Sequence, residues 1–234
     1  MKKTVLAIMA TSMMFAGSVS AHVTGDIGVY TSYVNGSGTV LDNLPVAQGQ
    51  ITYTFDNGAY VNGWFSQSLR EPGLDNTLGN EIDAKVGWDG RVSEKFSADF
   101  HVAYFDLANT KLLNCIDGDM IDVGGKLRFH ATETTSFYTH ADTYYGLGPK
   151  GFDDSWKVGL GVRTEMLGAT TDLSVYHVEK PDASGEFLKL SLEPNAVGHI
   201  MGCEIRSIST AWFPLGSYND THEVRIMTGF RMNW

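Results

Sequence analysis

The sequence has few cysteines and no long apolar stretch beyond its N-terminus. Its two cysteines, Cys115 and Cys203, are too few for the disulfide framework of a small secreted domain. After the N-terminal region, no segment approaches about 18 uninterrupted apolar residues, which excludes an ordinary transmembrane helix. P-loop, dinucleotide-binding and calcium-loop spacings are also missing. These absences leave no indicated cofactor or metal.

Basic residues are scarce as well. The chain holds 17 Lys and Arg against 27 Asp and Glu, a formal net charge of −10. Because nucleic-acid binding requires a basic face for the phosphates, this balance excludes nucleic acid as an expected partner. The chain is instead rich in glycine, with 26 residues, and 12% of it is aromatic. This composition is typical of many strands and turns.

The first residues have the pattern of a secretory signal peptide. Lys2 and Lys3 precede a largely apolar run over residues 5–17, and small residues at Val19 and Ala21 indicate cleavage after Ala21. That run is too short to span a bilayer as a helix. We therefore expect a signal peptide over residues 1–21 and a single domain over residues 22–234, a normal size for an all-β barrel.

Beyond the signal, apolar and polar residues alternate with the period of a half-buried strand. Trp156, Val158 and Leu160, for example, alternate with Lys157 and Gly159. Short turns and longer loops separate the runs in turn, as in an up-and-down meander with two unlike ends. We predict about twelve strands, over residues 25–34, 46–55, 59–69, 80–88, 94–106, 119–131, 135–146, 155–166, 170–179, 186–193, 198–213 and 222–234.

Alternation alone does not tell which face points inward. In a secreted β-sandwich the apolar face is inside, whereas in an outer-membrane barrel it faces lipid and the polar face lines the lumen. Aromatic residues near strand ends favour the barrel, because Tyr and Trp gather at membrane interfaces. We therefore predict an all-β, antiparallel, up-and-down transmembrane β-barrel in the outer membrane, in contact with its lipid and lipopolysaccharide. The aromatic residues in question are Trp64, Trp88, Tyr104, Tyr145, Trp156, Trp212, Phe213 and Trp234.

The C-terminus supports the same interpretation. Gly229, Met232 and Trp234 fit the last-strand pattern that the outer-membrane assembly machinery reads: a glycine, then two hydrophobic positions, of which the last is aromatic and terminal. Phenylalanine is the usual final residue, and Met227 occupies a position that is typically polar. We expect this tail to be the assembly signal.

The parity of each strand assigns the ionisable residues to the lumen or to the loops. Acidic and basic side chains are nearly balanced in the predicted lumen, so most of the negative charge is expected in loops such as NCIDGD and KGFDDS. An acidic mouth would raise the local concentration of cations. The predicted lumen-lining residues are Glu81, Asp83, Lys85, Asp99, His101, Asp122, Lys126, Arg128, Lys157, Arg163, Glu165, Glu204, Arg206, Arg225 and Arg231.

The sequence gives weaker support for a hydrolase site, a metal site or a disulfide. Ser136, His140 and Asp142 share one face of a predicted strand, but residues four apart on a strand lie about 13 Å apart, too far for a nucleophile and its base. The histidines show no metal-site spacing, although His22 would become N-terminal and could then chelate copper. We expect Cys115, in a loop, and Cys203, with lipid-facing parity, to remain unpaired.

Three segments resemble a known family. GDIGVYTSYV (residues 25–34), PVAQGQITYTFDNGAYVNGWFSQSL (residues 45–69) and NEIDAKVGWDG (residues 80–90) resemble the TorF-type porin family of proteobacteria. The resemblance covers the N-terminal third and implies an outer-membrane barrel without catalytic residues. The family's solutes are not established.

These features together predict a porin, a channel for passive diffusion of small hydrophilic solutes with a weak cation preference. Three alternatives stay open: a closed structural or adhesion barrel with a plugged lumen, a barrel enzyme, and a secreted soluble β-sandwich. Sequence does not indicate the solute, the pore radius or the oligomeric state.

Overall fold

The structure is a computed structural model, described over residues 21–36, 39–69, 80–106, 119–147, 154–181, 183–215 and 223–234. The predicted signal peptide up to residue 20 and most of the long predicted loops, including the one with Cys115, lie outside these residues. Within the described part, helices of the length and apolarity needed to cross a membrane are absent.

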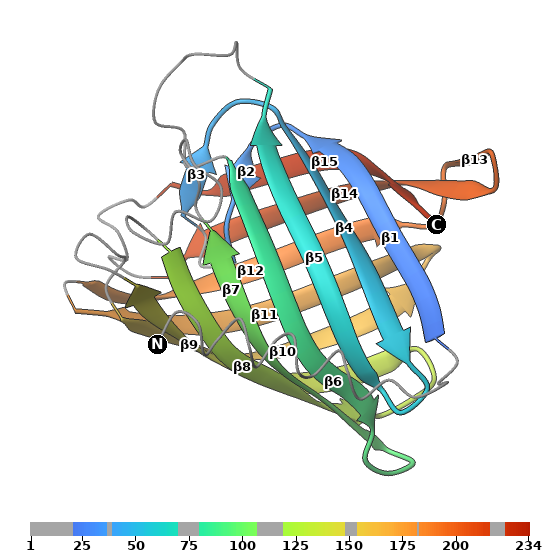
Figure 1. Ribbon diagram of the computed structural model, residues 1–234, viewed down its shortest axis with the longest axis horizontal. Helices are drawn as coiled ribbons and strands as arrows, with labels where there is room; N and C mark the ends of the chain where they lie inside the picture. The colour runs from blue at the N-terminus through green and yellow to red at the C-terminus, as the bar shows by residue number, and fades with distance from the viewer. Residues whose placement is uncertain are drawn as a thin grey trace.

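Twelve long antiparallel strands form one ring (Figure 1). Strands adjacent in sequence pair with each other, and the ring closes because β1 pairs with both β4 and β15 while β12 pairs with β14. Closure removes the sheet edges, whose unpaired backbone groups hydrocarbon does not tolerate. The predicted strand number and order are confirmed. The long strands are β1 (Ala21–Tyr30), β4 (Val46–Phe55), β5 (Ala59–Ser68), β6 (Glu81–Arg91), β7 (Phe96–Asp106), β8 (Asp119–His130), β9 (Thr135–Leu147), β10 (Ser155–Met166), β11 (Ala169–Lys180), β12 (Ala183–Pro194), β14 (Cys203–Pro214) and β15 (Arg225–Asn233).

Large apolar side chains cover the outer face of this ring. Leu160 and Ile226 are each 63% exposed and Phe100 is 61% exposed, while Phe129 and Val158 face the same way. The residues that alternate with them on each strand point inward and are mostly polar or glycine, many of them ionisable. This is the arrangement of a transmembrane barrel and the inverse of a soluble sandwich. The predicted outer-membrane barrel is therefore confirmed, and the soluble sandwich is wrong.

Short turns close one end of the barrel, the turn end, at residues 56–58, 92–95, 131–134 and 167–168. Leu167 and Gly168 have φ values of 52° and 74°, as in the primed two-residue turns that match the twist of paired strands. One predicted turn, over residues 89–93, begins too early. Asp89 still pairs with Asp99, so β6 continues to Arg91.

The predicted strand over residues 198–213 is divided by another tight turn. Met201 and Gly202, with φ values of 52° and 86°, reverse the chain between β13 (Gly198–Ile200) and β14. Only residues 209–214 of β14 pair with β12. The β13–β14 hairpin therefore extends beyond the ring, as Figure 1 shows at the right.

A second small hairpin lies between β1 and β4. The predicted first strand ends early, because Tyr30 makes the last pair with β15 at Gly229 and the chain then leaves the wall. Residues Tyr33–Val34 form β2, which pairs with β3 (Val40–Asp42) in a separate two-stranded sheet. Tyr33 and Val34 are buried against inward-facing residues of the barrel. The β2–β3 hairpin therefore occupies the lumen near the end opposite the turns, the loop end.

The C-terminal strand closes the ring against β1. Trp234 and Gly25 exchange two backbone hydrogen bonds of 3.1 and 3.0 Å. The Trp234 ring also covers Gly25, where a Cβ would lie 2.4 Å from Cζ2. Met232 and Trp234 face outward, and Gly229 faces inward beneath Tyr30. Recognition of this tail by the assembly machinery stays a prediction.

Candidate functional site

The inner face of the barrel is the candidate site. All the predicted lumen residues occupy the strand positions that alternate with exposed apolar ones. Their part in the passage of solutes stays a prediction. These residues are Glu81, Asp83, Lys85, Asp99, His101, Asp122, Lys126, Arg128, Lys157, Arg163, Glu165, Glu204, Arg206, Arg225 and Arg231.

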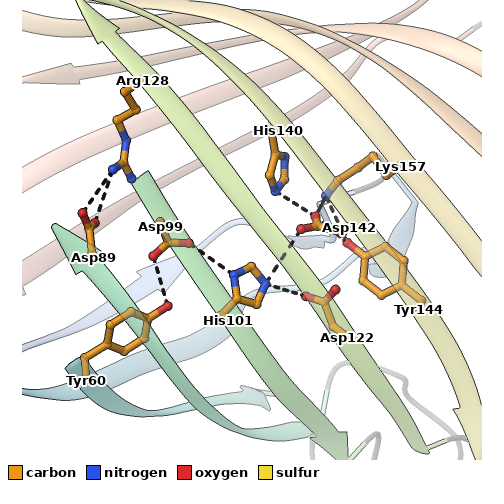
Figure 2. Close-up of polar contacts among 10 residues, drawn as sticks. All are labelled: Tyr60, Asp89, Asp99, His101, Asp122, Arg128, His140, Asp142, Tyr144 and Lys157. Carbon is orange, nitrogen blue, oxygen red and sulfur yellow. Dashed lines mark hydrogen bonds and ion pairs between the residues drawn. The ribbon is translucent and has the colours of Figure 1, made fainter. Parts of the chain in front are cut away.

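Five of the charged or titratable residues on β7–β10 form a connected group, which we call the ionic wall: Asp99, His101, Asp122, Asp142 and Lys157 (Figure 2). His101 Nδ1 lies 3.2 Å from Asp99 Oδ1, and its Nε2 lies 2.9 Å from Asp122 Oδ2. Lys157 Nζ lies 3.0 Å from Asp142 Oδ2. Asp122 is 3% exposed, and Asp142 and Lys157 are each 5% exposed. Pairing offsets the cost of burying these charges.

Tyrosines add further contacts to the charged residues of β7–β10. The Tyr60 hydroxyl donates to Asp99 at 3.1 Å, and Lys157 donates to the Tyr144 hydroxyl at 3.0 Å. Lys126 lies 4.5 Å from the centre of the Tyr138 ring, a cation–π distance. The polar lining is thus held by defined contacts rather than by free charges.

The other predicted lumen residues lie away from this group. Arg163 and Glu165 are exposed near the turn end, and Lys85 and Arg225 are half-buried on β6 and β15. Three arginines form other ion pairs. Arg128 pairs with Asp89 at 3.3 Å, whereas Arg206 and Arg231 share Glu193 at 3.5 and 2.5 Å, and Arg206 also pairs with Glu204 at 2.6 Å.

The adjacent part of the inner face is apolar, which corrects the expectation of a polar lumen. On β11, β12 and β14 the inward-facing residues Tyr176, Val178, Phe187 and Trp212 form a buried cluster, which we call the apolar wall. Val34 of the β2–β3 hairpin packs against it. An apolar surface facing a water-filled lumen would cost free energy, and the hairpin removes that surface from water.

The hairpin also reaches the opposite side of the ring. The Tyr33 ring packs against Trp64 of β5, with the ring centroids 5.7 Å apart and the planes tilted by 49°, and its hydroxyl donates a hydrogen bond to Glu81 of β6. In the twelve-strand ring β6 and β12 lie six strands apart, so Tyr33 and Val34 contact opposite walls. Burial and the Glu81 carboxyl raise the pKa of Tyr33 well above its usual range. The hairpin therefore crosses the lumen and narrows it.

A cavity of about 420 Å³ lies beside the hairpin. This volume is within the range of small-molecule sites. Its lining combines aromatic rings with two carboxyl groups and includes Tyr33, Trp64, Glu81, Asp83, Phe105 and Tyr144.

Two of the aromatic residues predicted for the membrane interfaces are wrongly placed. Trp64 and Trp212 have the inward parity of their strands and point into the barrel, where Trp64 contacts Tyr33 of the hairpin and Trp212 is part of the apolar wall. Tyr145, Trp156 and Trp234 are 46%, 41% and 49% exposed on the outer face, as an aromatic belt requires.

The hydrolase arrangement is not assembled. His140 Nε2 lies 2.9 Å from Asp142 Oδ2, but Ser136 pairs with Arg163 while His140 pairs with Gly159, two inward positions nearer the loop end. Cys203 is a free cysteine, and the predicted absence of a bond to Cys115 stays a prediction.

Sequence reasoning missed two features of this site. The sequence pattern predicts one continuous strand over residues 25–34, because Tyr33 and Val34 extend that run, and so it does not indicate the hairpin. The contacts of His101 with Asp122 and Asp142 join three strands, and no linear spacing reveals them. One signal was present: Tyr176 and Val178 on β11 and Trp212 on β14 put apolar side chains at inward positions near the loop end of their strands.

Solved structures similar to this fold include outer-membrane porins. The KdgM porin has a TM-score of 0.58 and 9% identity, over 90% of this chain and 96% of that protein. The NanC porin has a TM-score of 0.52 and 11% identity, over 91% of this chain and 98% of that protein. An outer-membrane channel from Pseudomonas putida F1 has a TM-score of 0.51 and 12% identity, over 93% of this chain and 96% of that protein. At these identities the likeness shows the fold alone.

Sequence comparison adds no closer assignment. No family model matches the chain, and no curated protein matches its sequence. The porin fold agrees with what the TorF-type resemblance implies, while membership of that family stays a prediction.

Proposed function

We propose that this chain is an outer-membrane channel through which small hydrophilic solutes diffuse passively, with a weak preference for cations. The observation that carries the proposal is the ionic wall inside a closed barrel with an apolar outer surface. Buried charges are expensive and have no structural need in a barrel that apolar side chains could fill. A polar path for hydrated solutes explains them.

The cavity beside the hairpin supports both the solute class and the charge preference. Rings such as Trp64 and Tyr144 offer faces to sugars or cations. Glu81 and Asp83 form a buried, hydrogen-bonded carboxyl pair, which carries one negative charge when it shares a proton and so attracts positive charge. Because Lys85 lies one inward position further along β6, the preference is expected to be weak.

The neighbouring structures suggest a comparison of solutes. One KdgM structure, at a TM-score of 0.57 and 8% identity, is a complex with oligogalacturonate, an oligomer of a sugar acid. The paired carboxyl groups of Glu81 and Asp83 disfavour such an anion at the present cavity. Neutral or cationic solutes of similar width are the better candidates.

Liposome swelling with sugars of graded size tests the channel, using the refolded chain from residue 22. We expect swelling with small sugars that falls with solute size. A reversal potential across a KCl gradient tests selectivity, and we expect a small cation-selective value. The double variant Glu81→Gln/Asp83→Asn should lose that selectivity and still swell. An anion-selective wild type would contradict the cation preference.

A closed barrel is the second candidate, and one observation favours it. The β2–β3 hairpin crosses the lumen and packs on the apolar wall, as a plug would. Failure of the wild-type protein to swell with any solute, together with swelling of a variant without residues 33–42, would favour this candidate over the channel.

A further inference from the structure

At the centre of the ionic wall, a gap over Gly124 lets the side chains of His101 and Asp142 approach each other. His101 pairs across the ladder with Gly124, and Gly124 pairs with Asp142. A Cβ at residue 124 would lie 2.0 Å from Asp142 Oδ1, so only glycine leaves room for this approach. Asp122, two residues before Gly124, reaches the same point from the loop side (Figure 2).

Three donor atoms meet in this gap. His101 Nε2 lies 2.9 Å from Asp122 Oδ2 and 3.8 Å from Asp142 Oδ1, and all three atoms lie within 4.8 Å of one another. A tetrahedral ion with bonds of about 2.0–2.1 Å holds its ligands about 3.3 Å apart. The donor distances of 2.9 and 3.8 Å therefore lie on either side of the distance expected between two ligands of one metal ion. We propose that His101, Asp122 and Asp142 bind a divalent transition-metal ion on the inner wall of the barrel.

A second observation points to a ligand here. Asp142 is 5% exposed, and its Oδ1 faces His101 without a hydrogen-bond partner in the described part of the chain. Asp122, 3% exposed, likewise has its Oδ1 without such a partner there. Buried carboxylate oxygens are normally satisfied, because leaving one unpaired costs its desolvation. A bound cation satisfies Asp142 Oδ1 directly.

The surrounding contacts orient the three ligands. Asp99 contacts the other ring nitrogen of His101, Nδ1, at 3.2 Å, and Tyr60 in turn holds Asp99. This is the carboxylate–histidine arrangement that fixes the tautomer of metal-binding histidines. Asp142 is held through its other oxygen, Oδ2, by Lys157 at 3.0 Å and by His140 at 2.9 Å.

The donor set selects the class of metal. One imidazole with two carboxylates suits zinc, manganese, cobalt or nickel, whereas calcium and magnesium prefer oxygen ligands alone. The nearby Lys157 ammonium opposes a cation, so moderate affinity is expected. The site does not require transport by the barrel, and its test is independent of the channel test.

Cobalt binding to the tag-free refolded barrel in detergent tests the site directly. We expect one Co²⁺ per chain, with the visible absorption of a protein-bound ion, displaced by Zn²⁺. Asp99→Asn should weaken binding by about tenfold through loss of the orienting carboxylate. His101→Gln and Asp142→Asn, which remove ligands, should weaken it further.

His177 supplies the matched control. This outward-facing histidine also lies between carboxylates, but its Nδ1 contacts Glu186 at 3.0 Å and its Nε2 contacts Glu179 at 3.3 Å. No single ring nitrogen there faces two carboxylates, so His177→Gln should leave Co²⁺ binding unchanged. Heat-modifiable migration in gels verifies that each variant is folded.

Two outcomes would overturn the proposal. Absence of Co²⁺ and Zn²⁺ binding by the folded wild type would mean that His101 only bridges carboxylates as an imidazolium. Binding that survives His101→Gln, or that is lost equally in His177→Gln, would place the metal elsewhere.

Discussion

The ionic wall and the apolar wall are neighbours on the same inner face, yet they are stabilised in different ways. On β7–β10, Asp142 and Lys157 are buried as a pair at 3.0 Å. On β11, β12 and β14, Phe187 and Trp212 are buried by the hairpin, through Val34. The residues of the ionic wall pair with residues on adjacent strands, whereas the apolar wall is covered by the β2–β3 hairpin, which enters the lumen.

This difference indicates that the inside of the barrel is not uniform. Where the lining is ionic, partners on neighbouring strands satisfy its charges, although Asp142 and Lys157 are buried. Where the lining is apolar, it needs a cover, because apolar surface in water is unfavourable. The position of the hairpin thus follows from the composition of the wall beneath it.

The largest effect is expected when a lysine charge is removed from the ionic wall and, for comparison, from the apolar wall. Lys157→Met leaves Asp142 buried without its ammonium partner and should destabilise the barrel by about 3–5 kcal/mol. Urea unfolding in lipid vesicles measures this change. The matched control is Lys189→Met, because Lys189 lies 5.7 Å from the Trp212 ring on the apolar wall. Equal losses in both variants would show that the walls do not differ.

The next effect tests the apolar wall itself. Trp212 is 3% exposed, so Trp212→Ala should cost about 3 kcal/mol and release the hairpin, raising conductance. Trp156→Ala, on the outer face at 41% exposure, should cost less and leave the conductance as it is. Planar bilayers and urea unfolding measure both quantities. An unchanged conductance in Trp212→Ala would argue against a docked hairpin.

A smaller effect is expected on the hairpin side of the same contact. Val34 is 6% exposed, and Val34→Ser should weaken docking by about 1–2 kcal/mol. The expected readout is a noisier and larger single-channel current. Val40→Ser, at a residue 39% exposed on β3, serves as control, and noise of equal size in both variants would contradict the contact.

The smallest effect concerns the other side of the lumen. Tyr33→Phe removes the hydrogen bond to Glu81 and should weaken docking by about 1 kcal/mol. Because the pKa of folded Tyr33 is raised above 10.0, its contribution is complete below that pH and is lost only as the pH rises further. Wild-type current should therefore show no step attributable to Tyr33 between pH 7 and about pH 9. A step in this window that Tyr33→Phe abolishes would refute the assignment.

The strands and their orientation could be predicted from sequence, because successive side chains of a strand point to opposite faces of the sheet. Once Val158 faces lipid, Lys157 must face the lumen. The hairpin could not be predicted in this way, since Tyr33 has the same parity as the outward Ile27 and Val29 although it has left the ladder of β1. The meeting of His101 and Asp142 across Gly124 depends on register between strands, which alternation does not specify.

Cross-linking of Val34 to Val178 tests the central claim, that the hairpin lies inside the barrel on the apolar wall. Cysteines at both positions, with Cys115 and Cys203 replaced by serine, should be joined efficiently by a short thiol-specific cross-linker in outer-membrane vesicles. The pair Val34→Cys/Val158→Cys, with the second cysteine on the lipid face, should stay unlinked. Failure of the first pair to cross-link in folded protein, with both thiols still reactive, would contradict the claim.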